Sequence, residues 1–105
     1  MSQINDRTRY GREIMDRLEA GLADKVTRRL SELDPGLPAL ITDYAFGDVV
    51  GRPGLDLKTR EMLTVASLVT LGNAMPQLEL HMRGALNTGV TPEELLEIVI
   101  QMAVY

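Results

Sequence analysis

The chain has 105 residues, no cysteine and a formal net charge of −4. This length fits one domain over residues 1–105, and its high ratio of surface to volume makes oligomerisation an option from the start. The missing cysteines exclude disulfides, thiolate metal sites and thiol redox chemistry, and the acidic balance without a basic run argues against a nucleic-acid partner.

The first predicted element is a charged, amphipathic helix from Asn5 to about Leu33. Its apolar residues recur at a spacing of four and form one stripe on a helix, with Gly21 as a candidate break. The stripe consists of Ile14, Leu18, Leu22, Val26 and Leu30.

A second helix is predicted to follow and to run to about Asp48. Asp34 followed by Pro35 has the pattern of a capping residue with proline in the first helical turn. The segment GRPGL, residues 51–55, then predicts a loop, because Gly and Pro favour turns and the proline restricts Arg52 to extended conformations.

Three more helices are predicted in the second half of the chain, over residues 57–71, 76–88 and from 92 onward. Local start and stop signals bound them. The bounding residues are Asp56 with Gly72 and Asn73, Pro76 with Gly89, and Thr91 with Glu94 in the spacing of a capping box.

The helices over 57–71 and 95–104 are apolar on nearly all sides, and such helices need cover on several faces. A chain of this length hardly supplies that cover alone. No strand-like alternation occurs, so the sequence predicts an all-α bundle of about five to six helices that forms a homo-oligomer through helix-on-helix contacts.

The single histidine, His81, lies within the apolar stripe of the helix over 76–88, three residues after Leu78 and four before Ala85. It is therefore predicted to face inward. Two interpretations stay open: a core histidine satisfied by a neighbouring polar group, or an imidazole used for proton transfer near neutral pH.

Glu61 shares this ambiguity, because it lies in one stripe with Val65 and Leu68. It is either an inward carboxylate that orients His81 or a first-turn glutamate favoured by the helix dipole. Glu79 and Arg83, four residues apart, have the spacing of a solvated ion pair.

Other kinds of site find little support. One histidine without cysteine, and without Glu-x-x-His or His-x-x-x-His spacing, predicts no metal, and no glycine-rich phosphate loop or nucleophile elbow occurs. Residues 1–20 are charged throughout, and the longest uncharged run, residues 62–78, is interrupted by polar residues. A soluble, cytoplasmic protein with no membrane partner and no cofactor is expected.

The segments YAFGDVVGRPGLDLKTREMLTVASLVTLG and QLELHMRGALNTGVTPEELLEIVIQMAVY resemble the carboxymuconolactone decarboxylase family from about Tyr44 to Tyr105. The resemblance implies the fold of the alkylhydroperoxidase D proteins and a trimer or hexamer. It also implies cofactor-free decarboxylation of 4-carboxymuconolactone, a small-molecule substrate of aromatic catabolism, to the enol-lactone of 3-oxoadipate.

Loss of carbon dioxide from that lactone leaves an extended enolate that needs a proton. His81 matches the family's histidine and is the expected proton donor, with Glu61 holding its tautomer or favouring its charged form. Arg52 is the leading anchor for substrate carboxylates, with Arg60 and Arg83 in reserve; for each arginine a surface salt bridge is the alternative.

The chain departs from the family pattern at three places. Ala74 and Gln77 stand where peroxidase-type relatives have cysteines, so thiol peroxidase activity is not expected. Phe46 and Val50 replace tryptophans of decarboxylases and alter the expected pocket. Relatives continue past Tyr105, so either the sequence is clipped or a pocket wall is missing.

Three functions are therefore considered. The first is a lactone decarboxylase. The second is another proton-transfer reaction on a small carbonyl acid. The third is a non-catalytic oligomeric scaffold in which His81 belongs to the core.

Overall fold

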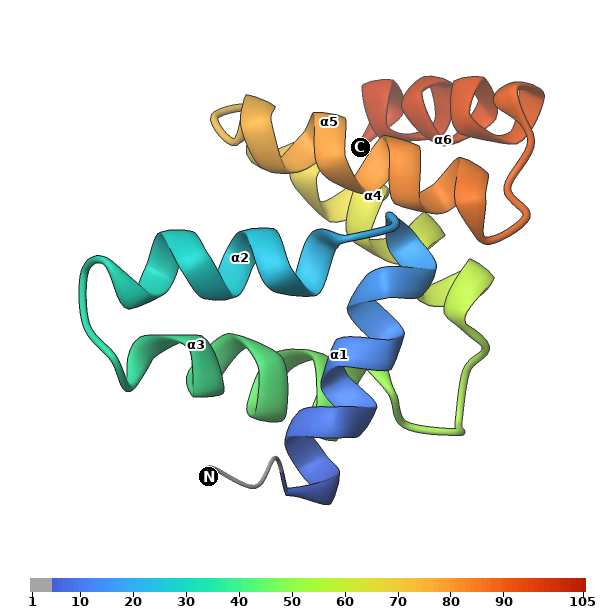
Figure 1. Cartoon of the computed structure of the whole chain (residues 1–105). Helices are drawn as coiled ribbons and strands as arrows, with labels where there is room; N and C mark the ends of the chain where they lie inside the picture. The colour runs from blue at the N-terminus through green and yellow to red at the C-terminus, as the bar shows by residue number, and fades with distance from the viewer. Residues whose placement is uncertain (1–4) are drawn as a thin grey trace. The chain divides into compact units, whose positions relative to one another are not determined.

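The computed structural model describes residues 5–105 (Figure 1), and within them it contains six α-helices, one π-helix and no strand. The all-helical prediction is confirmed. The described part of the chain divides into two compact units, which meet in the sequence between Gly54 and Leu55. A single domain over the whole chain stays a prediction.

The first unit begins with α1 (Asp6–Leu18) and α2 (Leu22–Ser31), which confirms Gly21 as the break in the amphipathic stretch. Gly21 has a φ of 80°, in the left-handed region that glycine adopts without strain. It has no side chain to cap α2. The Asp16 carboxylate of α1 does so, accepting a hydrogen bond of 2.9 Å from the Ala23 amide.

The second predicted helix begins later than expected and has a different geometry. Asp34 accepts a hydrogen bond of 2.7 Å from the Gly36 amide, which makes a turn. The predicted cap at Asp34 and Pro35 was therefore wrong. The helix begins with α3 (Leu37–Ala39) and continues as the π-helix η1 (Leu40–Val50).

Helices α1 and η1 cross closely enough that only glycine fits at the contact. A Cβ added at Gly11 would overlap the Thr42 carbonyl oxygen and lie 3.2 Å from the Gly47 nitrogen. A Cβ at Gly47 would lie 2.9 Å from the Arg7 carbonyl oxygen. The two glycines allow the main chains to meet directly.

The second unit consists of α4 (Leu57–Leu71), α5 (Met75–Asn87) and α6 (Pro92–Val104), with α4 in contact with both others. Its core contains Val65, Ala85 and Val90.

The predicted bounds of these helices are confirmed to within about a residue. Asp56 accepts from the Thr59 amide at 2.8 Å, Gly72 ends α4 in the left-handed conformation, and Thr91 with Glu94 makes the capping box. Among residues 5–105, no helix combines the length and the apolar character needed to cross a bilayer.

Candidate functional site

Glu61 and His81 meet in the second unit. Glu61 Oε2 lies 2.9 Å from His81 Nδ1, and the side chains are 1% and 12% exposed. Glu61 comes from α4 and His81 from α5, twenty residues later in the chain. The structure thus brings together the two residues proposed for catalysis.

The packing of α4 against α5 explains why these two side chains meet. Glu61 is one turn before Val65 on α4, and His81 is one turn before Ala85 on α5, and both apolar residues are fully buried in the same core. The polar pair therefore continues the apolar contact between the two helices by one turn. A buried carboxylate so placed needs a hydrogen-bonding partner, and the imidazole supplies it.

The contact also determines which imidazole nitrogen is available for chemistry. When Glu61 is ionised, its carboxylate accepts hydrogen bonds and donates none, and Nδ1 then carries the hydrogen that faces Glu61. In the neutral ring Nε2 then has a lone pair, and in the charged ring Nε2 carries a second proton. Glu61 thus leaves Nε2 as the atom that can give or take a proton.

Arg52 lies in the first unit, exposed in the loop that follows η1. Hydrogen bonds hold the backbone at this point: the Gly51 amide donates to the Phe46 carbonyl at 2.8 Å, and the Arg52 amide to the Val49 carbonyl at 3.2 Å. The Gly51 carbonyl in turn accepts from the Tyr10 hydroxyl at 2.6 Å.

The two reserve arginines lie in the second unit. Arg60 is half-buried in the first turn of α4, where its Nε donates to the Leu55 carbonyl at 3.1 Å. Arg83 is exposed on α5, and because it follows His81 by two positions it leaves the helix in nearly the opposite direction. A substrate-binding role for Arg52, Arg60 or Arg83 stays a prediction.

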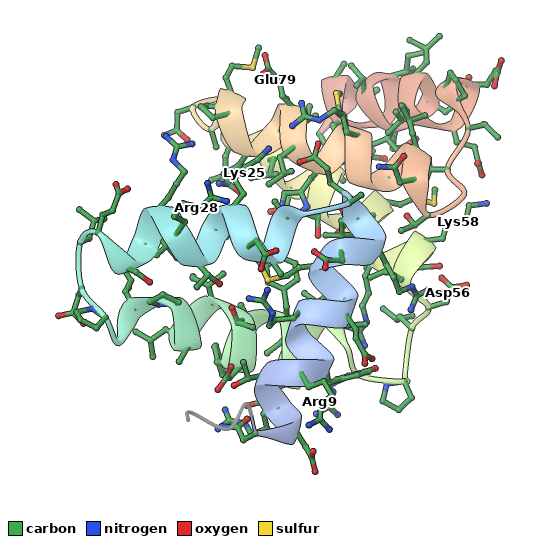
Figure 2. All side chains as sticks on the ribbon, in the orientation of Figure 1. Arg9, Lys25, Arg28, Asp56, Lys58 and Glu79 are labelled. Atoms are coloured by element: carbon green, nitrogen blue, oxygen red, sulfur yellow. The ribbon has the colours of Figure 1, made fainter. Side chains whose placement is uncertain are left out.

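Charged groups also lie at the start of α4 and α6. Lys58 Nζ lies 3.4 Å from Glu94 Oε1, the same oxygen that accepts the Thr91 amide at 2.9 Å. The hydrogen bond from the Thr91 amide lowers the pKa of Glu94 below its usual value. Hydrogen bonds from Thr59 likewise lower the pKa of Asp56, which is labelled beside Lys58 in Figure 2.

The two positions at which peroxidase-type relatives have cysteines lie at the start of α5. Ala74 precedes α5 and Gln77 is in its first turn, so the residues before His81 carry no thiol. Within residues 5–105 the structure contains no group of three or more acidic or histidine side chains placed to hold a metal ion.

Sequence reasoning did not single out Tyr10, Arg7 or Asp48, which support the loop that carries Arg52. Arg7 makes two hydrogen bonds to Asp48, at 3.1 and 2.6 Å. This contact and the hydrogen bond from Tyr10 to Gly51 each join residues 41 positions apart. The only signal in the sequence is that Tyr10 is the one aromatic residue in the charged first helix.

Comparison with known proteins decides the family. A model of the carboxymuconolactone decarboxylase family matches residues 35–105, more than half of the chain. The chain belongs to this family. The resemblance seen in the sequence is thereby confirmed, and His81 and Glu61 lie within the matched range.

Three relatives of this carboxymuconolactone decarboxylase family member are informative. The 4-carboxymuconolactone decarboxylase of Acinetobacter baylyi is 34% identical over 106 residues, which cover 97% of this chain and 78% of the relative. The nitrosuccinic acid decarboxylase of Metarhizium robertsii is 50% identical over 66 residues, 63% of this chain and 46% of the relative. An uncharacterized 15.0 kDa protein of Paracoccus denitrificans is 34% identical over 96 residues, 90% of this chain and 72% of the relative. The similarity to two decarboxylases supports a decarboxylase-like function.

Proposed function

We propose that this chain is a cofactor-independent decarboxylase of small carboxylic acids, in which His81 supplies a proton and Glu61 positions the imidazole. The observation that carries this proposal is the 2.9 Å hydrogen bond between the nearly buried side chains of Glu61 and His81, in a member of a decarboxylase family. The hydrogen bond to Glu61 orients the imidazole through Nδ1 and leaves Nε2 for proton transfer.

The substrates in the names of the two decarboxylase relatives share a chemical feature. In 4-carboxymuconolactone the departing carboxylate is on a carbon that is linked through a double bond to the lactone carbonyl, and in nitrosuccinic acid it is on the carbon that carries the nitro group. In each case, the electron pair left by carbon dioxide can move onto electronegative oxygens. We propose a substrate of this class, with 4-carboxymuconolactone, an intermediate of aromatic catabolism, as the first candidate.

The proposed reaction has two steps. The bond between the carboxylate and its carbon breaks, carbon dioxide leaves, and the electron pair is delocalised onto the carbonyl oxygen as an enolate. The proton on His81 Nε2 then moves to carbon, and Nε2 regains a proton from water. Arg52 is the proposed anchor for a carboxylate of the substrate, because its planar guanidinium suits two parallel hydrogen bonds.

Release of carbon dioxide from 4-carboxymuconolactone and from nitrosuccinic acid tests the proposal. His81→Ala should lower kcat by roughly 10²- to 10⁴-fold, the usual effect of removing a general acid or base. Glu61→Gln should cause a smaller loss, because the amide keeps a hydrogen bond to the ring. Gln77→Ala, an exposed change on the same helix, is the matched control and should retain activity.

An active His81→Ala variant would contradict the proposal, and so would a wild-type protein without turnover on either acid. Turnover on other small carbonyl acids that still requires His81 would favour the alternative proton-transfer reaction. If no acid is turned over and none stabilises the protein against heat, the non-catalytic scaffold is favoured.

We also propose that the protein is a homo-oligomer, a trimer or hexamer, whose interface includes the exposed side of α4 and α6. No residue of α6 is buried, and Leu96 and Val104 are 59% and 72% exposed. A groove of about 400 Å³ lies between α4 and α6 and is lined by apolar residues, among them Leu63 and Ile98, and by glutamates. Apolar area of this extent favours burial against another copy.

Light scattering coupled to size-exclusion chromatography tests the oligomer. The double variant Leu96→Glu, Ile100→Glu should reduce the mass to that of one chain. Leu33→Glu changes an even more exposed leucine outside this face and should leave the oligomer intact. A monomeric wild-type protein would contradict the proposal.

We further propose that the protein is located in the cytoplasm, which cell fractionation can test.

A further inference from the structure

The loop that carries Arg52 is constrained on both sides of the arginine. Pro53 restricts the backbone of Arg52 to extended conformations on one side. On the other side, the amide hydrogen bonds of Gly51 and Arg52 attach the loop to the end of η1. The backbone from which the Arg52 side chain extends therefore has a defined position.

Tyr10 of α1 contacts this same point with both its ring and its hydroxyl. The hydroxyl donates to the Gly51 carbonyl at 2.6 Å. The ring lies so close that a Cβ added at Gly51 would overlap Tyr10 Cε2, and it would also lie 2.9 Å from the Gly47 carbonyl oxygen. Glycine at position 51 and tyrosine at position 10 thus fit each other.

A second contact supports the first. Arg7 is one turn before Tyr10 on α1, and its partner Asp48 is three residues before Gly51, so the two contacts run parallel along the same pair of helices. The hydrogen bond from Arg7 lowers the pKa of Asp48, which keeps the carboxylate charged and the contact intact at neutral pH. Together the contacts fix the end of η1 against α1.

We infer that Tyr10 is a positioning residue for Arg52. Its hydroxyl holds the Gly51 carbonyl, so that the Arg52 guanidinium loses less conformational freedom when it binds a substrate carboxylate. This inference rests on the proposed role of Arg52 in substrate binding. An arginine side chain loses much conformational freedom when it binds, and fixing its backbone beforehand reduces that loss. The effect belongs to binding and not to the proton transfer at His81.

Hydrogen exchange tests the contact without any substrate. Tyr10→Phe keeps the ring and removes only the hydroxyl. In the full-length protein, amides of residues 47–55 should exchange faster in Tyr10→Phe than in the wild type, measured by mass spectrometry. Tyr44→Phe, the same change at an exposed tyrosine of η1, should leave this exchange unchanged. Unchanged exchange in Tyr10→Phe would overturn the inference.

Kinetics on 4-carboxymuconolactone or nitrosuccinic acid, whichever the wild type decarboxylates, then tests the link to Arg52. Tyr10→Phe should raise KM by roughly three- to tenfold with kcat nearly unchanged, as expected for the loss of one hydrogen bond. Arg52→Gln should raise KM further. In the Arg52→Gln background, Tyr10→Phe should have no additional effect, because the residue through which it acts is gone.

The outcomes separate this inference from the proposed function. If Arg52→Gln raises KM but Tyr10→Phe does not, or if the two effects add, Tyr10 does not act through Arg52 and the inference is wrong. If Arg52→Gln leaves KM unchanged, Arg52 is not the anchor and the inference falls with it, whereas the roles of His81 and Glu61 stand or fall with their own variants. If neither acid is turned over, the proposed function fails. In that case the exchange experiment alone decides whether the contact holds the loop.

Discussion

The two units of the chain are stabilised by contacts of different kinds. In the first unit, α1 meets η1 through glycines, and polar side chains tie the helices together: Arg7 to Asp48, Tyr10 to Gly51 and Arg12 to Asp24. In the second unit, α4 and α5 meet through an apolar core that contains one buried polar pair, Glu61 and His81.

Burial distinguishes the polar contacts of the two units. The ion pairs of the first unit are largely exposed, and such pairs contribute little to stability individually. Glu61 and His81 are nearly buried, and a buried polar pair is often no more stabilising than apolar residues of similar size. A buried pair in an otherwise apolar core is therefore the better candidate for function. Four experiments on the two units test this difference.

The largest expected effect is at the glycine contact of the first unit. Gly11→Ala would place a Cβ against the Thr42 carbonyl, a backbone atom that can move only if η1 moves. We expect a loss of about 3 kcal/mol or more in the free energy of unfolding, at the upper end of overpacking. Urea denaturation measures it. Gly54→Ala, where a Cβ meets no atom within 4 Å, should change stability by less than about 0.5 kcal/mol.

The next effect concerns the buried pair of the second unit. His81→Leu leaves the Glu61 carboxylate buried without its partner and should cost about 1–3 kcal/mol of unfolding free energy. The double variant Glu61→Met, His81→Leu should recover most of this loss, because no orphaned charge remains. Recovery of stability without recovery of activity would identify the pair as functional. Failure to recover would instead indicate that the pair is needed for packing.

A smaller effect is expected at the cap of α6. Thr91→Ala removes the hydroxyl that accepts the Glu94 amide and should cost about 1 kcal/mol in thermal or chemical unfolding. Thr91→Ser keeps the hydroxyl and should cost little. Thr70→Ala, an exposed position inside α4, is the control and should be neutral or slightly stabilising, because threonine is a weak helix former. An equal loss in all three variants would argue against the cap.

The smallest effect is a dependence of stability on pH. The hydrogen bond from Arg7 lowers the pKa of Asp48 from its usual 3.8. This carboxylate therefore stays ionised to a lower pH in the folded protein than in the unfolded chain. The resulting stabilisation is present above pH 3.8 and is lost as the pH falls through the lowered pKa of the folded state. Melting temperatures between pH 6 and pH 2 should therefore fall slightly less for Asp48→Asn than for the wild type. Glu13→Gln, an exposed change on α1, should follow the wild type.

The sequence predicted the second unit better than the first for a physical reason. Asp56, Gly72, Thr91 and Glu94 act on backbone groups within four residues of themselves, so their effect can be read locally. The inward faces of Glu61 and His81 follow from helical periodicity. The stretch 40–50 carries no local signal that distinguishes a π-helix from an α-helix, and its close contact with Gly11 depends on residues about thirty positions away.

The same limit applies to the candidate site. Periodicity predicted that His81 faces inward and left Glu61 open between an inward and a first-turn role, and the packing of α4 on α5 brings their polar atoms to hydrogen-bonding distance. Tyr10 could not have been found this way, because its partner Gly51 is 41 positions away and contributes a carbonyl, which every residue has. Unlike the helix caps, a contact to a main-chain atom far away in the sequence leaves no mark on the local pattern of side chains.

The orientation of the imidazole has a consequence for the stereochemistry of the product. With Nδ1 bound to Glu61, only Nε2 can deliver a proton, and a nitrogen fixed in space approaches a planar enolate from one face. Turnover of 4-carboxymuconolactone in heavy water should then introduce one deuterium at the carbon next to the lactone carbonyl, where the extended enolate is protonated to give the enol-lactone, in a single configuration. A racemic label would mean that water, and not the histidine, supplies the atom.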